Sequence, residues 1–351
     1  MPPKKKDKAV DADDGDPGMH PATLLSNYTK FCKLICVAPN PKLVEMLSND
    51  DKVEELKKNK QLILDDEKGQ LGPAGTRALC TAIMGSGQGM VNAQCRVVKI
   101  LRFWRVNVNN DGAACIAELL RLGGAEIAIT FLELLDNNVG AAGARCLGQA
   151  LMYGQNRSLV TLKLDYNYTL GSEGVAALCQ GLRTNSSLRQ LHLPYCNIGP
   201  EGGAPLGEML SYRLTALVLL NLQGNQLCGR GMSDICDGLA SNAVLTSLSL
   251  ADNGVGQCDE DLDAVKKLGL VVVQPGNALT AIDLLYNRIG EKGGRALLDI
   301  WKGKTPNKVK QLLVDSTLPQ QLFDHLCRID AAGGKKKKGN KGAKKKKKKK
   351  T

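Results

Sequence analysis

The side chains of this chain that could do chemistry do not assemble into a catalytic set. Histidine occurs three times, at His20, His192 and His325, and these positions lie far apart. No combination of them with a serine, cysteine or aspartate suggests a nucleophile and its base. We therefore expect no catalytic residues and no enzyme activity.

Phosphate and metal sites are not indicated either. Residues 303–305, Gly-Lys-Thr, end like a phosphate-binding loop, but Leu298 stands where that motif needs its first glycine. Cys32 and Cys36 have no second cysteine pair close by, as a zinc site would require. We expect no cofactor, no metal and no small-molecule substrate.

The remaining candidates are side chains suited to binding, and a repeated segment positions them. Residues 188–193 place leucines with the spacing L-x-x-L-x-L, which alternates with period 2 and predicts a short strand. Residues 202–210 then place Gly202, Leu206 and Leu210 at helical spacing. This strand–turn–helix unit recurs about eight times, mostly in steps of 28 to 31 residues.

A recurring unit of this kind is a leucine-rich repeat. Its length leaves room for a helix behind each strand. The predicted fold is therefore α/β, a leucine-rich-repeat solenoid (horseshoe) of about eight repeats, with a concave parallel sheet, convex helices and helical caps. The form L-x-L-x-x-N-x-I/L-G-x-x-G-x-x-x-L, as in residues 162–178, resembles the ribonuclease-inhibitor-like subclass. We expect the repeated asparagines to turn inward and bind backbone groups: Asn137, Asn167, Asn225, Asn253 and Asn287.

Composition divides the chain into five parts. Residues 1–18 are charged and rich in aspartate, proline and glycine, which predicts disorder. Residues 19–60 are predicted to form an N-terminal helical cap, 61–315 the repeat array, and 316–332 a C-terminal cap helix. Residues 333–351 are a disordered polylysine tail.

Some segments depart from the regular pattern. The cap is predicted as two helices separated at Pro39 and Pro41. Residues 85–97 lengthen the first connection as a surface loop. Residues 263–279 lengthen the seventh repeat and weaken its helix signal. The last strand is predicted at 311–314.

The charge of the protein is concentrated in its tail. The 12 lysines of the tail equal the net charge of the whole chain, +12, so the repeats are close to neutral. Such a tail attracts polyanions such as the acidic tails of tubulin or RNA, and a solubilising or nuclear-import role is the alternative. The tail lysines are Lys335, Lys336, Lys337, Lys338, Lys341, Lys344, Lys345, Lys346, Lys347, Lys348, Lys349 and Lys350.

The chain holds 12 cysteines, no apolar run long enough to span a membrane and, in residues 1–18, no apolar region of a signal peptide. We therefore expect reduced thiols. Cys196 occupies the asparagine position of its repeat, and five further cysteines lie in apolar helix stripes: Cys80, Cys115, Cys146, Cys179 and Cys236.

The x positions of L-x-L-x-x-N are expected to face solvent on the concave sheet. Aromatic residues make up only 4% of the chain, yet Trp104, Tyr166, Tyr195 and Tyr286 fall at such positions. Aromatic residues among mixed charges are typical of protein interfaces. The predicted protein-binding residues are Arg102, Trp104, Arg105, Glu133, Asp136, Lys163, Asp165, Tyr166, His192, Tyr195, Asn221, Gln223, Asp252, Asp283 and Tyr286.

A narrower resemblance concerns residues 27–47 (NYTKFCKLICVAPNPKLVEML) and 293–298 (GGRALL). Both are similar to segments of leucine-rich-repeat proteins from centrosomes and cilia. The resemblance implies a non-enzymatic interaction scaffold, a cytoplasmic, cytoskeletal component of the ciliary axoneme or centriole. The alternatives are a nuclear or nucleolar RNA-associated factor that uses the lysine tail, and a cytosolic inhibitor or adaptor.

Overall fold

The computed structural model describes most of the chain, namely residues 21–68, 71–85, 94–123, 126–302 and 308–328. The predicted disordered N-terminus, most of the predicted 85–97 loop and the lysine tail lie outside these residues. The described end of that loop differs from the prediction. Cys95 and Val97 are buried, so this part belongs to the core and not to the surface.

One sheet of nine parallel strands runs through the molecule, and its strands follow one another in chain order. The second residue of every strand is leucine or isoleucine and pairs with its counterpart in the next strand, as Leu162 pairs with Leu191. The strands are β1 (Gln61–Asp65), β2 (Ile100–Trp104), β3 (Phe131–Leu135), β4 (Thr161–Lys163), β5 (Gln190–His192), β6 (Leu219–Asn221), β7 (Ser247–Ser249), β8 (Ala281–Asp283) and β9 (Gln311–Leu313).

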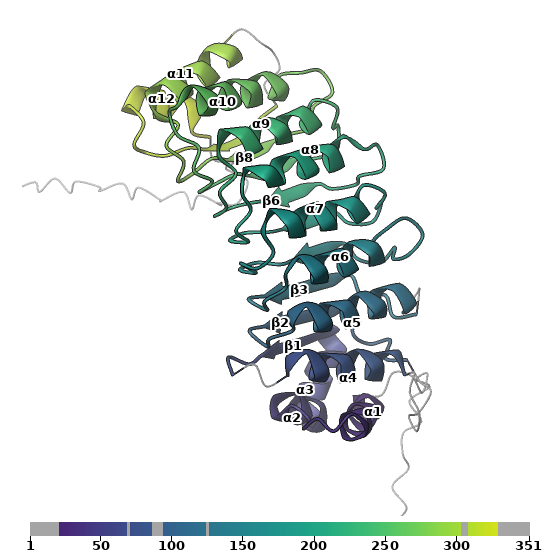
Figure 1. Ribbon diagram of the computed structural model, residues 1–351. Coiled ribbons are helices and arrows are strands. Elements are labelled where there is room, and N and C mark those ends of the chain that lie inside the picture. The colour runs from purple at the N-terminus through teal and green to yellow at the C-terminus, as the bar shows by residue number, and fades with distance from the viewer. Residues whose placement is uncertain (1–20, 69–70, 86–93, 124–125, 303–307, 329–351) are drawn as a thin grey trace, which may run out of the picture.

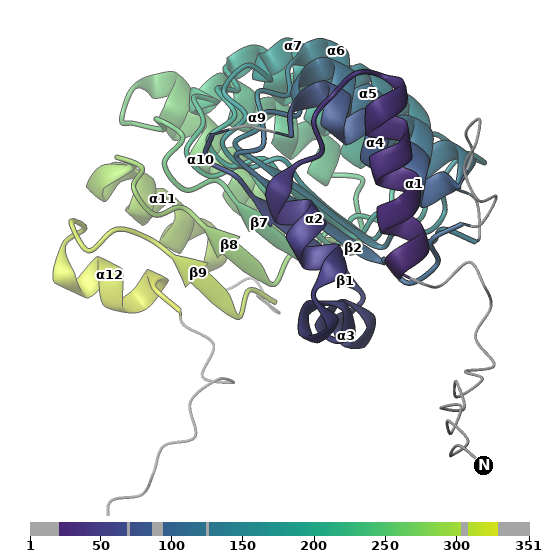
Figure 2. The ribbon, with the colours of Figure 1, turned by 90° about the horizontal axis from the view of Figure 1, so that it is seen from below.

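A row of helices covers one face of this sheet and leaves the other face on the inside of the arc (Figures 1 and 2). The predicted solenoid fold is therefore confirmed. The helices of the array are α4 (Gly72–Met84), α5 (Asn109–Leu122), α6 (Ala141–Ala150), α7 (Gly171–Leu182), the 3-10 turn η2 (Pro200–Gly202), α8 (Gly203–Ser211), α9 (Cys228–Leu239), α10 (Asp259–Val272) and α11 (Gly290–Trp301).

One helix of the array, α10, lies partly in an irregular segment of the sequence. Residues 263–279 carry a weak helix signal in the sequence, yet residues 263–272 belong to α10, which is a helix of 14 residues. Its buried face includes Ala264, Val265 and Leu268. The apolar run that follows, Val271 and Val272, is the buried end of this helix.

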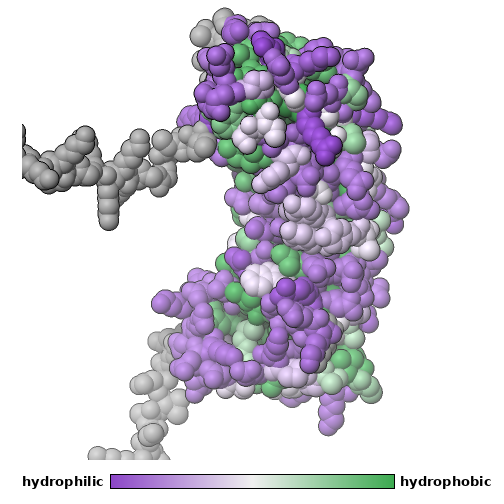
Figure 3. All heavy atoms as spheres, turned by 90° about the vertical axis from the view of Figure 1, so that its left-hand side faces the viewer, coloured by the Kyte–Doolittle hydropathy of each residue, from purple (hydrophilic) through white to green (hydrophobic). Residues whose placement is uncertain are grey.

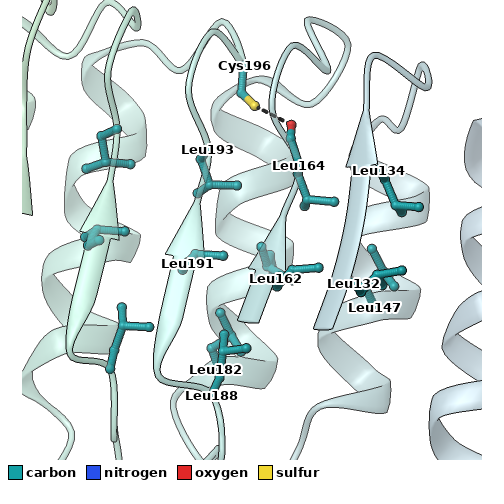
Figure 4. Close-up of a cluster of buried hydrophobic side chains, with 14 of the residues drawn as sticks. Leu132, Leu134, Leu147, Leu162, Leu164, Leu182, Leu188, Leu191, Leu193 and Cys196 are labelled. Carbon is teal, nitrogen blue, oxygen red and sulfur yellow. Dashed lines mark hydrogen bonds between the residues drawn. The ribbon is translucent and has the colours of Figure 1, made fainter. Parts of the chain in front are cut away.

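Leucines fill the space between the sheet and the helices. Those of neighbouring repeats stand one beside the other, as Leu132, Leu162 and Leu191 do in Figure 4. Burying each one stabilises the fold by roughly 1.5–3 kcal/mol, whereas ordering about 28 backbones costs more than the leucines of one repeat supply. Each repeat therefore depends on its neighbours.

The repeated asparagines are buried and bind the backbone, which confirms the prediction for them. Oδ1 of Asn167 accepts from the amides of Asn137 (3.1 Å) and Val139 (2.9 Å) in the preceding repeat. Its Nδ2 donates to the carbonyls of Leu134 (2.7 Å) and Leu164 (2.8 Å). Each such side chain therefore joins two repeats at the end of the strand.

A second set of asparagines lies at the opposite end of the strands, and the sequence analysis missed it. Nδ2 of Asn185 donates to the carbonyl of Leu151 at the end of α6 (2.7 Å), and its Oδ1 accepts from the amide of Leu188 (2.7 Å). The signal that could have found it is an asparagine two or three residues before the first leucine of a repeat. The set comprises Asn156, Asn185, Asn242 and Asn277.

Helices also close both ends of the described array. At the first end, α1 (Pro21–Leu34) is followed by α2 (Pro41–Ser48) and α3 (Asp50–Asn59), where two helices had been predicted. Asn49 makes the difference, because its amide donates to the carbonyl of Glu45 at the end of α2 and its side chain accepts from Lys52 in α3. At the other end lies α12 (Gln320–Leu326).

Candidate functional site: the concave face

The third residues of strands β2 to β8 form a continuous polar row across the concave face. Register pairs each of them with its counterpart on the next strand, and neighbouring strands lie about 4.8 Å apart. We call this the mid-strand row. It comprises Arg102, Glu133, Lys163, His192, Asn221, Ser249 and Asp283.

Two residues further along, a second row contains both large and apolar side chains. We call it the strand-end row, and most of its members are partly exposed. Asp165 is the charged residue at its centre, with apolar residues on the strands to either side. The row comprises Trp104, Leu135, Asp165, Pro194, Gln223, Ala251 and Leu285.

The next residue of each repeat does not lie on the sheet, which corrects the placement expected for several predicted residues. The backbone there has positive φ, between 52° and 69°, and turns the chain toward the helix. These side chains stand at the corner beside the sheet. This corner row comprises Arg105, Asp136, Tyr166, Tyr195, Gly224, Asp252 and Tyr286.

Two corner tyrosines stack on each other. The rings of Tyr166 and Tyr195 are 4.8 Å apart between centroids at an interplanar angle of 13°. Tyr168, which the sequence analysis did not select, packs edge-on against Tyr166 at 6.3 Å. Gly224 leaves space for the ring of Tyr195, because a Cβ there would lie 2.2 Å from it. Tyr166 and Tyr168 nevertheless remain 39% and 57% exposed.

Glu133 is not available to a partner in the way expected. Its side chain accepts from Arg102 at 3.1 Å, and the residue is only 5% exposed. The Arg102 guanidinium also lies 4.6 Å from the centre of the Phe131 ring. Phe131 is the first residue of β3 and was missed, although period 2 places the residue before the first leucine on the concave face too.

Four buried side-chain atoms in this part of the face lack a hydrogen-bond partner among the described residues. They are Arg102 Nε, Trp104 Nε1, Asp165 Oδ1 and His192 Nε2. Burial raises the pKa of Asp165 to about 6, with Lys163 opposing and Glu133 reinforcing the shift. Burial also lowers the pKa of His192 to about 4, so its ring is neutral at pH 7.

The C-terminal half of the concave face differs from β2 to β5 in the size of its side chains. Small polar residues replace the large ones, and they leave a hollow of about 220 Å³. The space-filling view shows that the molecule is hollowed partway along its length and that much of the visible surface is hydrophilic (Figure 3). The predicted residues that line this hollow are His192, Asn221, Gln223 and Asp283.

The predicted binding residues therefore fall into separate groups. Arg102, Trp104, Glu133, Lys163, Asp165 and His192 lie together on or beside β2 to β5. Tyr166 and Tyr195 adjoin them at the corner. Asp252 and Tyr286 stand apart on later corners, and Arg105 pairs with Asp65 at 2.7 Å.

Other kinds of site find no support in the described residues. No group of three histidine, cysteine or acidic side chains within them could hold a metal ion. None of the helices described is at once long and apolar enough for a membrane crossing.

Known proteins share the repeat. A family model described as a leucine rich repeat matches residues 155–179 and 184–207. A ribonuclease inhibitor of Sus scrofa is 31% identical over 247 residues, which cover 64% of this chain and 51% of that protein. NACHT, LRR and PYD domains-containing protein 13 of Homo sapiens is 31% identical over 153 residues, 43% of this chain and 14% of that protein.

A protein phosphatase 1 regulatory subunit 37 homolog of Caenorhabditis elegans is 28% identical over 143 residues, 40% of this chain and 14% of that protein. The chain thus spans between 14% and 51% of the length of these three relatives. Among solved structures, the actin-binding site 2 of leiomodin-1 has a TM-score of 0.35 at 13% identity, with 52% of this chain and 83% of that chain covered. A likeness at this score carries no argument about function.

Proposed function

We propose that this chain, which is a leucine-rich-repeat protein with repeats of the ribonuclease-inhibitor-like type, is a non-enzymatic scaffold that binds a protein partner on β2 to β5 of its concave face. The observation that carries the proposal is the group of four buried polar atoms on this part of the face that have no hydrogen-bond partner within the described part of the chain. A buried polar group left unpaired is unfavourable, and a partner that moved the side chains covering these atoms would relieve that cost with its own hydrogen bonds.

The side chains around these atoms support the same proposal. Arg102 and Trp104 are of the types that contribute most to protein interfaces. The stacked Tyr166 and Tyr195, at the corner after β4 and β5, are already ordered against each other, so little further side-chain freedom would be lost on binding.

The triple variant Trp104→Ala, Tyr166→Ala, Tyr195→Ala should lose at least tenfold in partner capture, because it removes three anchors from one side of the face. Tagged wild-type and variant chains would be recovered from cells that express the protein, and co-purified proteins quantified by mass spectrometry. Thermal unfolding should change little, because these side chains are partly exposed.

The matched control for that experiment is Arg145→Ala on α6. This residue lies on the helical side of the molecule and is exposed. Its capture should equal that of the wild-type chain. A set of captured proteins that is the same for the triple variant and the wild type would contradict the proposal.

The proposal also includes a location: the chain would be a structural component of the ciliary axoneme or centriole. It is supported by the resemblance of residues 27–47 to centrosomal and ciliary proteins. In the structure these residues belong to α1 and α2, where Tyr28 and Cys32 are buried. The 12 lysines of the tail would add a salt-dependent attraction to acidic tails of tubulin or to another polyanion.

Fractionation of ciliated cells tests the proposed location in the axoneme or centriole directly. The tagged chain, with and without residues 333–351, should stay in the detergent- and salt-resistant axonemal pellet, because the repeats themselves would be docked. A nuclear pool that ribonuclease releases, and that depends on the tail, would instead support the RNA-associated alternative.

The inhibitor or adaptor alternative is favoured by a specific observation, the names of two relatives. One is a ribonuclease inhibitor and another a regulatory subunit homolog of protein phosphatase 1. Under this alternative the chain would be extracted by detergent, and an enzyme would co-purify with it in a stoichiometric complex that the concave-face variant disrupts.

A further inference from the structure

Asp165 is a carboxylate without an ion-pair partner among the described residues, and it lies near the middle of the concave face. Its neighbours in the strand-end row are Leu135 on one side and Pro194 on the other. The backbone bonds that hold this order join the Asp136 amide to the Asp165 carbonyl and the Tyr166 amide to the Pro194 carbonyl, both at 2.9 Å. The carboxylate therefore sits between apolar side chains, and its Oδ1 is buried with no hydrogen-bond partner in the described segments.

No nearby charged group forms an ion pair with Asp165 within the described residues, although Lys163 lies close enough to lower the pKa of its carboxyl. The ammonium of Lys163 lies 5.8 Å from the centre of the Phe131 ring, on the neighbouring strand β3, and forms no salt bridge with another described residue. Glu133 is occupied by Arg102. His192 on β5 is uncharged at pH 7, and its Nε2 is the second unpaired atom in this region.

We propose that Asp165 anchors an arginine side chain of the protein partner, whose guanidinium bonds Asp165 and His192 while its aliphatic stem covers the partly exposed Leu135. This inference rests on the proposed function and names the partner chemistry of the same surface. A guanidinium has only donors, whereas a carboxylate and a neutral imidazole can both accept.

Arginine fits this surface better than lysine does. Its planar head is more weakly hydrated than an ammonium and stacks on aromatic rings, and Tyr166 follows Asp165 directly. An ammonium is a compact, strongly hydrated charge and would lose more of its hydration between Leu135 and Pro194.

The full chain and two small probes test this anchor without a known partner. N-acetyl-arginine amide is the positive probe, and N-acetyl-citrulline amide is its uncharged isostere. Histidine-selective labelling gives three ring signals for NMR, from His20, His192 and His325. The arginine probe should shift the His192 signal in a saturable way, and citrulline should leave it unchanged.

Asp165→Asn should weaken binding of the arginine probe at least tenfold, because it removes the charge and keeps the shape. Asp299→Asn, an exposed aspartate on α11 outside the sheet, is the matched control and should bind as the wild type does. Asp165→Asn should unfold at the same or a higher temperature, since an unpaired buried carboxylate opposes folding. Equal binding of the two probes, or an unchanged affinity in Asp165→Asn, would overturn the anchor.

Acidification supplies an independent test. Protonation removes the negative charge of Asp165, so binding of the arginine probe should be present above the carboxyl pKa of about 6 and be lost as the pH falls through it. From pH 7.5 to pH 5 the affinity should fall about tenfold. An affinity that is the same at both pH values would count against the anchor.

The outcomes also separate this inference from the proposed function. If Asp165→Asn keeps the cellular partner while the triple variant at Trp104, Tyr166 and Tyr195 loses it, the surface binds a partner but the arginine anchor is wrong. If neither variant changes partner capture, the proposed function fails as well.

Discussion

Gly181→Ala should destabilise the protein strongly, although the same change in an exposed helix normally stabilises it by about 1 kcal/mol. Gly181 lies in α7, and a Cβ there would stand 1.9 Å from the carbonyl oxygen of Gly148 in α6. The obstacle is backbone and cannot rotate away. The two helices would have to separate, and the loss should be about 3 kcal/mol, measured by denaturant unfolding followed by circular dichroism.

A milder glycine position provides the control for this experiment. At Gly269 in α10, a Cβ would meet only the side-chain ends of Leu297 and Ile300, at 3.1 and 3.2 Å. Gly269→Ala should therefore cost much less than Gly181→Ala. If both variants unfold at the same denaturant concentration as the wild type, backbone contact between α6 and α7 is not what requires glycine.

Asn167→Ala should cost roughly 4 kcal/mol of unfolding free energy, the other large effect that we expect. The change removes the hydrogen-bond partner of the amides of Asn137 and Val139 and of the carbonyls of Leu134 and Leu164. These groups are buried, and each one left unpaired costs about 1–3 kcal/mol. Denaturant unfolding measures the loss, and loss of cooperativity would show the repeats separating at this point.

The protein contains its own reference for that variant. Cys196 occupies the same position in the next repeat, and its thiol contacts the carbonyl of Leu164 at 3.1 Å (Figure 4). Burial raises the pKa of this thiol to about 12, so it stays protonated and can donate. Asn167→Cys should cost less than Asn167→Ala, and Cys196→Asn should be neutral or stabilising. A Cys196→Asn variant as damaged as Asn167→Ala would contradict this account.

The sequence predicts the repeat well because each repeat carries the pattern in its own residues. Leu191 and its counterparts alternate with period 2, and this alternation is enough to predict the strand and its buried face. The role of Asn167 also follows from its type and place, because an inward amide has to pair with the backbone at a turn.

The binding surface could be predicted only in part, because its geometry depends on neighbouring repeats. The positive φ of Tyr166 and Tyr195 moves them from the sheet to the corner, and this conformation is set by the turn toward the helix. The pairing of Glu133 with Arg102 joins side chains 31 residues apart in the sequence. Their role in binding stays a prediction.

The sequence by itself thus determined the unit, its period and the direction of its leucines, since these are local properties of a chain that alternates with period 2 and then with 3.6. The tertiary structure decided which side chains are left for a partner. Asp165 makes no ion pair among the described residues, and the stacking of neighbouring repeats places the ammonium of Lys163 over the Phe131 ring and Arg102 against Glu133. Gly181 is needed only because α6 and α7 touch through their backbones, a contact that exists only when the repeats are stacked.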